Sequence, residues 1–344
     1  MSVLALRKSY WVGLAVPISL ATATVLATPQ QATAAILLLL GVALALSAVF
    51  AWIGSRARSQ TETELCFPQR HEDLTGLNKR KTSSEIVPEF RRALDHEEFE
   101  VVYQPQFNLA TERQCGFEAL IRWHHPVHGE IAPSHFIAVA EDTGFIAPLG
   151  RWVLRRACSD AAAWPDALFV SVNLSPAQFY QDDVALMVAG VLRETGLAPS
   201  RLELEITENL LIGDTDDVLD NLNRLRQLGV SIAMDDFGTG YSSLSYLSRF
   251  PFSKIKIDRQ FIRSMTHDQA MRAIVKTIIA LGRSLGVTIT AEGVETVEQA
   301  AMLRAFGCPQ VQGFLYGYPG PAVANIIPRR GRSAAVAGRQ TSVA

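Results

Sequence analysis

The sequence has little imbalance of charge and little cysteine. Its 344 residues contain 32 Lys and Arg against 34 Asp and Glu, which gives a formal net charge of -2. Such a balance provides no general attraction for a polyanion, so it argues against DNA as the partner. The cysteines, Cys66, Cys115, Cys158 and Cys308, are widely spaced and form no Cys-x-x-Cys pair. This usage is typical of a cytosolic domain with reduced thiols.

Charge is missing altogether from residues 9–55, which contain no Asp, Glu, Lys or Arg. Two apolar segments within it, 11–27 and 32–53, would measure about 26 Å and about 33 Å as helices, and a bilayer core is roughly 30 Å thick. Basic residues flank the pair on both outer sides, so the positive-inside rule places both ends in the cytoplasm. We therefore predict a transmembrane hairpin at 1–55, in contact with membrane lipid. The alternative is a signal peptide cleaved near residues 32–34.

Two further segments lack the periodicity of folded elements. Residues 56–85 are polar and rich in Ser, Thr, Arg and Glu, which predicts a linker. Residues 322–344 are small, basic and aperiodic, which predicts a disordered tail. The folded domain is then expected at 86–321.

Within that domain, short β-branched runs alternate with amphipathic ones. The strand candidates are 99–105, 115–121, 168–173, 201–206, 230–235, 254–257, 287–291 and 310–314. Residues 271–283 place Ile274, Ile278 and Leu281 on one helical face. Strands that alternate with helices in this way predict an α/β fold, a TIM-like (β/α)8 barrel.

Polar side chains end most of the predicted strands. They are Glu118, Asn173, Glu205, Glu208, Asp235, Asp236, Lys256, Asp258, Glu292, Glu295 and Gln312. Because the carboxyl ends of barrel strands form the active face, we expect these side chains to meet around one pocket. Any one of the acidic residues alone could be a helix cap instead.

Carboxylates gathered in one pocket would repel one another and raise each other's pKa. Divalent cations would remove that repulsion, and a set of oxygen ligands suits hard ions such as Mg²⁺ or Mn²⁺. Two such ions can activate a water molecule and hold a phosphate diester for in-line attack. His124, His125 and His128 lack the spacing of a compact zinc site and are interpreted as surface residues.

Several motifs resemble the EAL domain of bacteria. They are Tyr103-Gln104-Pro105, Glu118-Ala119-Leu120-Ile121-Arg122-Trp123, Asn173-Leu174-Ser175, Glu205-Ile206-Thr207-Glu208, Asp235-Asp236-Phe237-Gly238, Lys256-Ile257-Asp258-Arg259, Ala291-Glu292-Gly293-Val294-Glu295 and Gln312-Gly313-Phe314. The resemblance implies a phosphodiesterase that cuts cyclic di-GMP to linear pGpG with two Mg²⁺ or Mn²⁺ ions. It also implies a barrel whose first strand is antiparallel, and a homodimer formed through this domain. Together with the hairpin, it predicts a multi-pass protein of the bacterial inner membrane with its catalytic domain in the cytoplasm.

The resemblance further implies a role for each residue of the pocket. Glu118, Asn173, Glu205 and Asp235 would bind one metal ion, Asp235 and Asp236 would bind the second, and Glu292 would be the metal-linked general base. Lys256 would orient the attacking water. Gln104, Arg122, Asp258 and Gln312 would surround the substrate, and Glu208 and Glu295 would hold the loop that follows Asp236.

Departures from the family pattern are few. Cys308-Pro309 precedes the last strand where Cys-Asp is usual, and Tyr318 stands where a basic residue is more common. Residues 73–80 resemble the opening of a GGDEF domain, but the chain leaves no room for the rest of one, which excludes cyclase activity. The alternative to a hydrolase is a degenerate EAL module that acts as a cyclic di-GMP receptor. Such modules lose metal or base residues, whereas this chain keeps them.

Overall fold

The computed structural model describes residues 83–165, 167–181, 183–208, 210, 215–238 and 249–322. The predicted transmembrane hairpin at 1–55, most of the predicted linker and the predicted tail lie outside these residues. The last residues of the predicted linker differ from expectation, because a helix already begins at Ser83. Among the described helices, none combines the length and the apolar composition needed to cross a bilayer.

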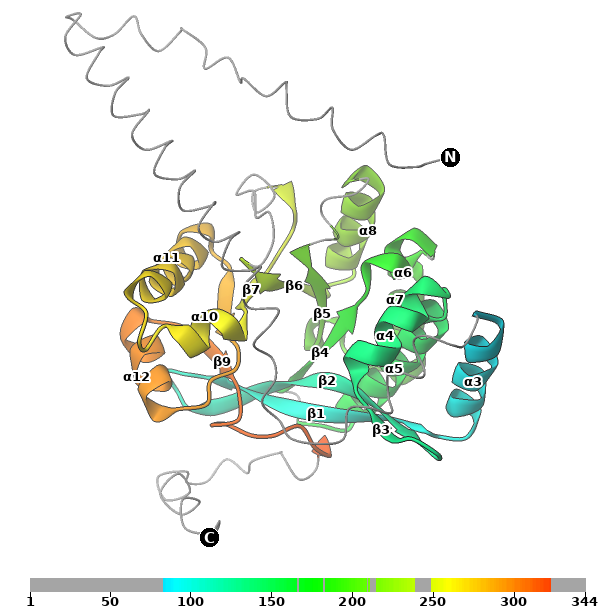
Figure 1. Ribbon diagram of the computed structural model, residues 1–344. Helices are drawn as coiled ribbons and strands as arrows, with labels where there is room; N and C mark the ends of the chain where they lie inside the picture. The colour runs from blue at the N-terminus through cyan, green and yellow to red at the C-terminus, as the bar shows by residue number, and fades with distance from the viewer. Residues whose placement is uncertain are drawn as a thin grey trace, which may run out of the picture. The chain divides into compact units, whose positions relative to one another are not determined.

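Strands and helices alternate along the described chain (Figure 1). The strands are β1 (Phe99–Asn108), β2 (Arg113–His125), β3 (Gly129–Ile131), β4 (Phe169–Leu174), β5 (Leu202–Thr207), β6 (Ser231–Phe237), β7 (Lys254–Ile257), β8 (Thr288–Ala291) and β9 (Gln310–Gln312). The helices are α3 (Ser83–Asp95), α4 (Pro133–Asp142), α5 (Ile146–Ala162), α6 (Pro176–Gln181), α7 (Val184–Thr195), α8 (Thr215–Gln227), α10 (Arg259–Ser264), α11 (Gln269–Leu285) and α12 (Val297–Phe306). A short 3-10 helix, η2 (Pro199–Arg201), precedes β5.

The sheet closes into a barrel through its first strand. The strand order is β1-β9-β8-β7-β6-β5-β4-β2-β3, and β1 also pairs with β2. Strand β1 is antiparallel to both of its neighbours in the ring, whereas the pairs from β2 round to β9 are parallel. The predicted TIM-like barrel with an antiparallel first strand is therefore confirmed.

Strand β3 was not predicted. It pairs with the end of β2, where Trp123 lies opposite Ile131, and so lengthens the β1–β2 ribbon beyond the barrel. The turn before it depends on Gly129, whose φ of 71° lies in the left-handed region that favours glycine. A strand this short carries too few residues for an alternating pattern to reveal it.

The helix that was predicted at 271–283 is α11, which is longer at both ends. Its first turn is capped by the carboxylate of Asp268, which accepts hydrogen bonds from the backbone N–H groups of Ala270 and Met271. Gly286 ends it in the left-handed conformation typical of a helix terminus. Figure 1 places α10, α11 and α12 on one side of the barrel and α4 to α7 on the other.

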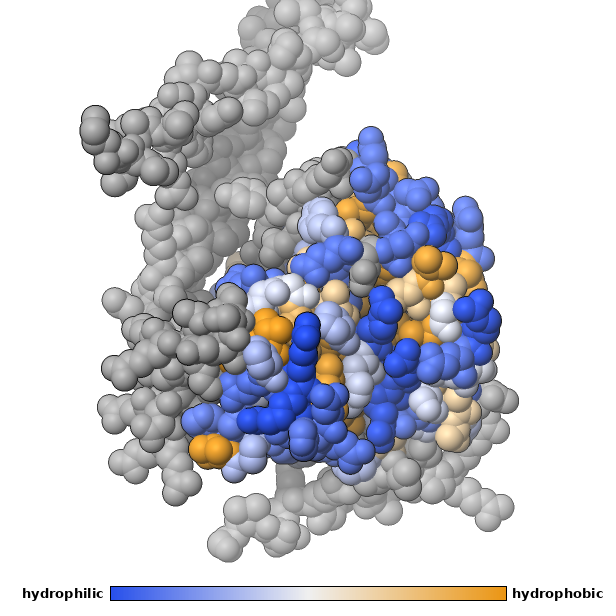
Figure 2. Space-filling view, turned by 90° about the vertical axis from the view of Figure 1, so that its right-hand side faces the viewer, coloured by the Kyte–Doolittle hydropathy of each residue, from blue (hydrophilic) through white to orange (hydrophobic). Residues whose placement is uncertain are grey.

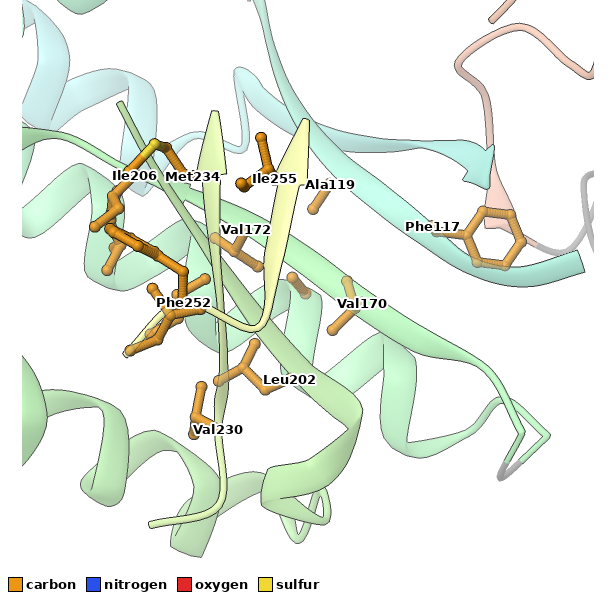
Figure 3. Packing of buried hydrophobic residues seen from close by; sticks show 14 of the residues in the cluster. Phe117, Ala119, Val170, Val172, Leu202, Ile206, Val230, Met234, Phe252 and Ile255 are labelled. Atoms are coloured by element: carbon orange, nitrogen blue, oxygen red, sulfur yellow. The ribbon is translucent and has the colours of Figure 1, made fainter. Parts of the chain in front are cut away.

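Apolar side chains of the barrel strands pack on the helices, and polar side chains such as Ser171, Glu205 and Lys256 alternate with them toward the barrel interior, because successive residues of a strand face opposite ways. Phe117, Val170, Val172, Leu202 and Ile206 are buried members of the apolar layer (Figure 3). Burial of one such side chain contributes about 1.5–3 kcal/mol. The polar residues between them are held inward by this packing, which places them at the site described next.

The outer surface on the α3 side is mostly hydrophilic, with small and separate hydrophobic areas (Figure 2). Scattered apolar residues of this kind are normal on a protein surface. This face therefore gives no reason to expect an extensive apolar contact.

Candidate active site

The ammonium group of Lys256 lies at the centre of a cluster of carboxylates inside the barrel. Its Nζ is 2.5 Å from Glu292 Oε1, 2.7 Å from Glu205 Oε2, 3.5 Å from Asp235 Oδ1 and 3.8 Å from Glu118 Oε2. Lys256, Glu205 and Asp235 lie near the ends of β7, β5 and β6, Glu292 directly follows β8, and Glu118 lies in the middle of β2. The convergence expected from the strand ends is thus present.

Amide side chains complete the cluster around Glu118. Asn173, at the end of β4, donates from Nδ2 to Glu118 Oε1 over 2.8 Å. Gln312, at the end of β9, donates from Nε2 to Glu118 Oε2 over 2.5 Å and to Gln104 Oε1 over 2.9 Å. Gln104 in turn donates from Nε2 to the carbonyl oxygen of Gly317 over 3.2 Å. These bonds fix the positions of Glu118, Gln104 and Gln312 relative to one another.

The cluster holds more negative charge than Lys256 balances. Burial raises the pKa of Glu292 to about 8, with a further contribution from the charges of Asp235 and Glu118. Lys256 acts in the opposite direction but does not outweigh them. Burial and the neighbouring Glu118 also raise the pKa of Glu205 well above its ordinary value. For Glu118 burial acts in the same direction, but Lys256, Gln312 and Asn173 outweigh it and lower its pKa. The pocket therefore favours cations or protons.

Asp236 occupies an unusual backbone position beside the cluster. Its φ is 54°, and its backbone N–H donates to Asp235 Oδ1 over 2.9 Å. Burial, followed by the charges of Asp235 and Asp258, raises its pKa to about 6. A non-glycine residue with positive φ costs free energy, which functional sites often tolerate. Asp258 also caps α10 by accepting from the backbone N–H of Gln260.

The other predicted residues lie at different places around the site. Arg122 is on β2, beyond Glu118. Its Nη1 donates a hydrogen bond to the carbonyl oxygen of Ile121 over 2.8 Å, and its Nε lies 3.7 Å from Glu130 Oε1. Glu208 follows β5 and is buried. Neither of its carboxylate oxygens has a hydrogen-bond partner among the described residues.

Glu295 does not join the cluster through its side chain, which is exposed. Its backbone N–H donates to Gln299 Oε1 over 2.8 Å, next to the capping box of α12. Residues 239–248, which form most of the loop that Glu208 and Glu295 are predicted to hold, lie outside the described residues. The loop-holding role of both therefore stays a prediction.

A second buried ion pair lies one layer deeper in the barrel and was missed by the sequence analysis. Lys254 Nζ is 2.8 Å from Glu203, and both side chains are buried. The ammonium group also lies 4.2 Å from the ring centre of Phe169. The signal was available, because Glu203 and Lys254 each stand two residues before a predicted site residue and so face the same way.

The interpretation of His125 as a surface residue was wrong. Its side chain is buried, Nε2 lies 2.7 Å from Glu89 Oε1, and Nδ1 accepts from the backbone N–H groups of Val127 and His128. His125 thus joins α3 to the β2–β3 turn. Among the described residues, no group of three or more Asp, Glu, His or Cys side chains has the arrangement of a metal site. The carboxylates of the pocket instead face the ammonium group of Lys256.

Comparison with known proteins identifies this arrangement. The EAL domain family matches residues 88–319. The chain belongs to the EAL domain family. The curated relatives include the bifunctional diguanylate cyclase/cyclic di-GMP phosphodiesterase MucR of Pseudomonas aeruginosa, 44% identical over 242 residues, which are 69% of this chain and 35% of MucR. The cyclic di-GMP phosphodiesterase NbdA of the same organism is 43% identical over 70% of this chain and 31% of NbdA.

Solved structures share the EAL fold. The PaMucR phosphodiesterase in complex with c-di-GMP has a TM-score of 0.67 and 44% identity, over 70% of this chain and 99% of that one. BlrP1 of Klebsiella pneumoniae, in a manganese and c-di-GMP complex, has a TM-score of 0.58 and 33% identity, over 65% of this chain and 56% of that one. This EAL chain spans about a third of the length of MucR and NbdA.

Proposed function

We propose that the chain is a membrane-anchored phosphodiesterase that hydrolyses cyclic di-GMP to linear pGpG. The observation that carries the proposal is the convergence of Glu118, Glu205, Asp235 and Glu292 on Lys256 at the carboxyl ends of the barrel strands. Relatives named as cyclic di-GMP phosphodiesterases support the substrate.

The donor set fits two hard cations, Mg²⁺ or Mn²⁺. The ligands would be the carboxylates of Glu118, Glu205, Asp235, Asp236 and Glu292 and the amide of Asn173. Oε2 of Glu205 pairs with Lys256, but its Oε1 is buried and has no hydrogen-bond partner among the described residues, and a buried polar atom without a partner is costly. Cations would relieve that cost and the repulsion that raises the pKa of Glu292. When bound, the ions supply positive charge to the phosphate and lower the pKa of water.

The protein's own residues then have distinct tasks. Glu292 accepts a proton from the attacking water, and the ammonium of Lys256 orients that water and stabilises the negative charge that develops on the phosphate. A bond forms between the water oxygen and phosphorus while the ester bond on the opposite side breaks, and the leaving ester oxygen takes up a proton from solvent to become a hydroxyl of the product. The product is the linear dinucleotide, which keeps both phosphates.

Substrate contacts come from the residues around this centre. Arg122 carries a planar guanidinium that can bind a phosphate through two parallel hydrogen bonds. Gln104 and Gln312 are held together by their mutual hydrogen bond and present amides to the sugar-phosphate ring. Asp258 adds an acceptor beside Asp236.

We extend the proposal to location, assembly and the loop. The charge pattern of residues 1–58 supports a hairpin in the bacterial inner membrane with the barrel in the cytoplasm, and the family resemblance supports a homodimer. Glu208, buried without a partner among the described residues, would hold the loop after Asp236. A Glu208→Gln protein with unchanged activity and unchanged response to metal would contradict this role.

The test is direct hydrolysis by the full-length chain. Purified protein is incubated with cyclic di-GMP and Mg²⁺ or Mn²⁺, and the products are separated by ion-exchange chromatography. The proposal predicts pGpG with either ion, none with chelator and none from Glu118→Gln. Binding of cyclic di-GMP without any hydrolysis would favour the receptor alternative.

A further inference from the structure

Two aromatic side chains lie stacked on each other on the turn that follows β9. The ring centres of Phe314 and Tyr318 are 4.6 Å apart, and the ring planes differ by 22°. The two residues are 48% and 63% exposed. Within the described part of the chain, Tyr180 is the one other aromatic residue among the exposed large hydrophobic residues. Ring surface gathered in this way is a common feature of ligand contacts.

The turn that carries these rings is fixed on both sides. A Cβ atom at Gly313 would lie 2.2 Å from the backbone nitrogen of Val294, so glycine is required for the turn to pack on the loop that follows Glu292. On the other side, a Cβ atom at Gly317 would lie 2.5 Å from Pro105 of β1. The backbone that carries the rings is thus fixed before any ligand arrives, which lowers the entropy cost of binding.

The turn also borders the residues predicted to bind substrate. Gln312, which directly precedes it, donates to Gln104 and Glu118, and the carbonyl oxygen of Gly317 accepts from Gln104. The turn that carries the stacked rings therefore lies directly beside the amides of Gln104 and Gln312 and not on a remote surface.

We propose that Phe314 and Tyr318 form a stacking platform for one purine base of the cyclic dinucleotide. The inference rests on the proposed function. The phosphates of a cyclic dinucleotide lie in its ring and the bases project from it, so phosphates held at the carboxylate cluster leave a base free to reach the rim. Aromatic side chains bind bases through their π-faces. The tyrosine at 318, where the family more often has a basic residue, gives this chain a ring at that place.

Fluorescence tests the platform without requiring catalysis. A cyclic dinucleotide with 2-aminopurine in place of one guanine is titrated into the full-length chain in the presence of chelator, because stacking on an aromatic ring quenches 2-aminopurine. We expect quenching with the wild type and with Tyr318→Phe, and its loss with Tyr318→Ala. Tyr180→Ala, which removes an exposed tyrosine from α6, is the matched control and should quench like the wild type.

Kinetics give the second readout. Stacking of one base is equivalent to about a tenfold change in affinity, so Tyr318→Ala and Phe314→Ala should each raise KM for cyclic di-GMP about tenfold with kcat unchanged. If the wild type hydrolyses nothing, the proposed function fails while the quenching experiment still decides the platform. Unchanged quenching in Tyr318→Ala would overturn the platform. A change in sedimentation with unchanged KM would also overturn it, because the rings would then belong to a contact between chains.

Discussion

Lys256 and Glu205 form an ion pair that is shielded from water, with Nζ 2.7 Å from Oε2 and side chains 1% and 0% exposed. Two residues earlier on the same strands, Lys254 and Glu203 form a second buried pair. The two pairs differ in their surroundings. Lys256 is shared among several carboxylates, whereas Lys254 faces Glu203 alone among its described salt-bridge partners. We therefore infer that the Lys256–Glu205 pair takes part in the reaction and that the Lys254–Glu203 pair stabilises the fold.

Removal of Lys254 should destabilise the fold. Lys254→Met leaves the carboxylate of Glu203 buried without its partner, and loss of one member of a buried pair costs about 3–5 kcal/mol. We expect a lower free energy of unfolding by about that amount, measured by urea denaturation followed by circular dichroism.

The control is the double variant Glu203→Leu with Lys254→Met, which removes both charges. Apolar replacement of a whole buried pair is often neutral or stabilising, so the double variant should recover most of the loss. Equal destabilisation in the single and double variants would mean that the side chains matter through packing and not through charge.

Removal of Lys256 should lower the catalytic rate. Lys256→Met takes away the group that orients water and meets developing charge, and such losses reduce kcat by about 10²–10³-fold. Binding of cyclic di-GMP, measured by isothermal titration calorimetry in chelator, should change far less. A Lys256→Met protein with nearly normal kcat would remove this residue from the reaction.

Cation binding should strengthen as pH rises. The pKa of Glu292 is about 8 in the protein without metal, so this carboxyl group is protonated at neutral pH and must lose its proton to act as a ligand. The apparent affinity for Mn²⁺ should therefore rise between about pH 6 and pH 8, by about tenfold per unit for each proton released, and level off above. Calorimetry in two buffers of different ionisation enthalpy counts the protons. An affinity that is the same at pH 6 and pH 8 would contradict the assignment.

Arg122 should affect substrate binding more than turnover. Charge-assisted hydrogen bonds contribute about 1.5–3 kcal/mol, so Arg122→Ala should raise KM for cyclic di-GMP by roughly 10- to 150-fold. Arg122→Lys should recover only part of the loss, because an ammonium group cannot make the two parallel bonds of a guanidinium. Full recovery by lysine would indicate that charge alone is used.

The barrel and its polar rim could be predicted because alternation along each strand encodes them. In β5, Leu202, Leu204 and Ile206 alternate with Glu203 and Glu205, so one face must pack on helices and the other must face the interior. The predicted strands agree with the structure to within three residues at each end, except that β2 continues four residues further, to His125.

Contacts between distant residues were not predictable in the same way. His125 is buried because α3 places Glu89 against it, and nothing in the local pattern specifies that pairing. Asp236 takes a positive φ at an irregularity between β6 and β7, which depends on strand pairing. The stacking of Phe314 on Tyr318 likewise depends on how the turn folds between Val294 and Pro105.

The most direct measurement is the number of Mn²⁺ ions that the full-length chain binds, counted by electron paramagnetic resonance of free Mn²⁺ during titration. If the carboxylates and the amide of the cluster together bind a pair of hard cations, the wild-type chain should bind two ions. Glu205→Gln should then bind fewer ions, and Asp236→Asn should lose one ion. If the wild type binds no Mn²⁺, or if both variants bind as many ions as the wild type, the cluster around Lys256 is not the metal site.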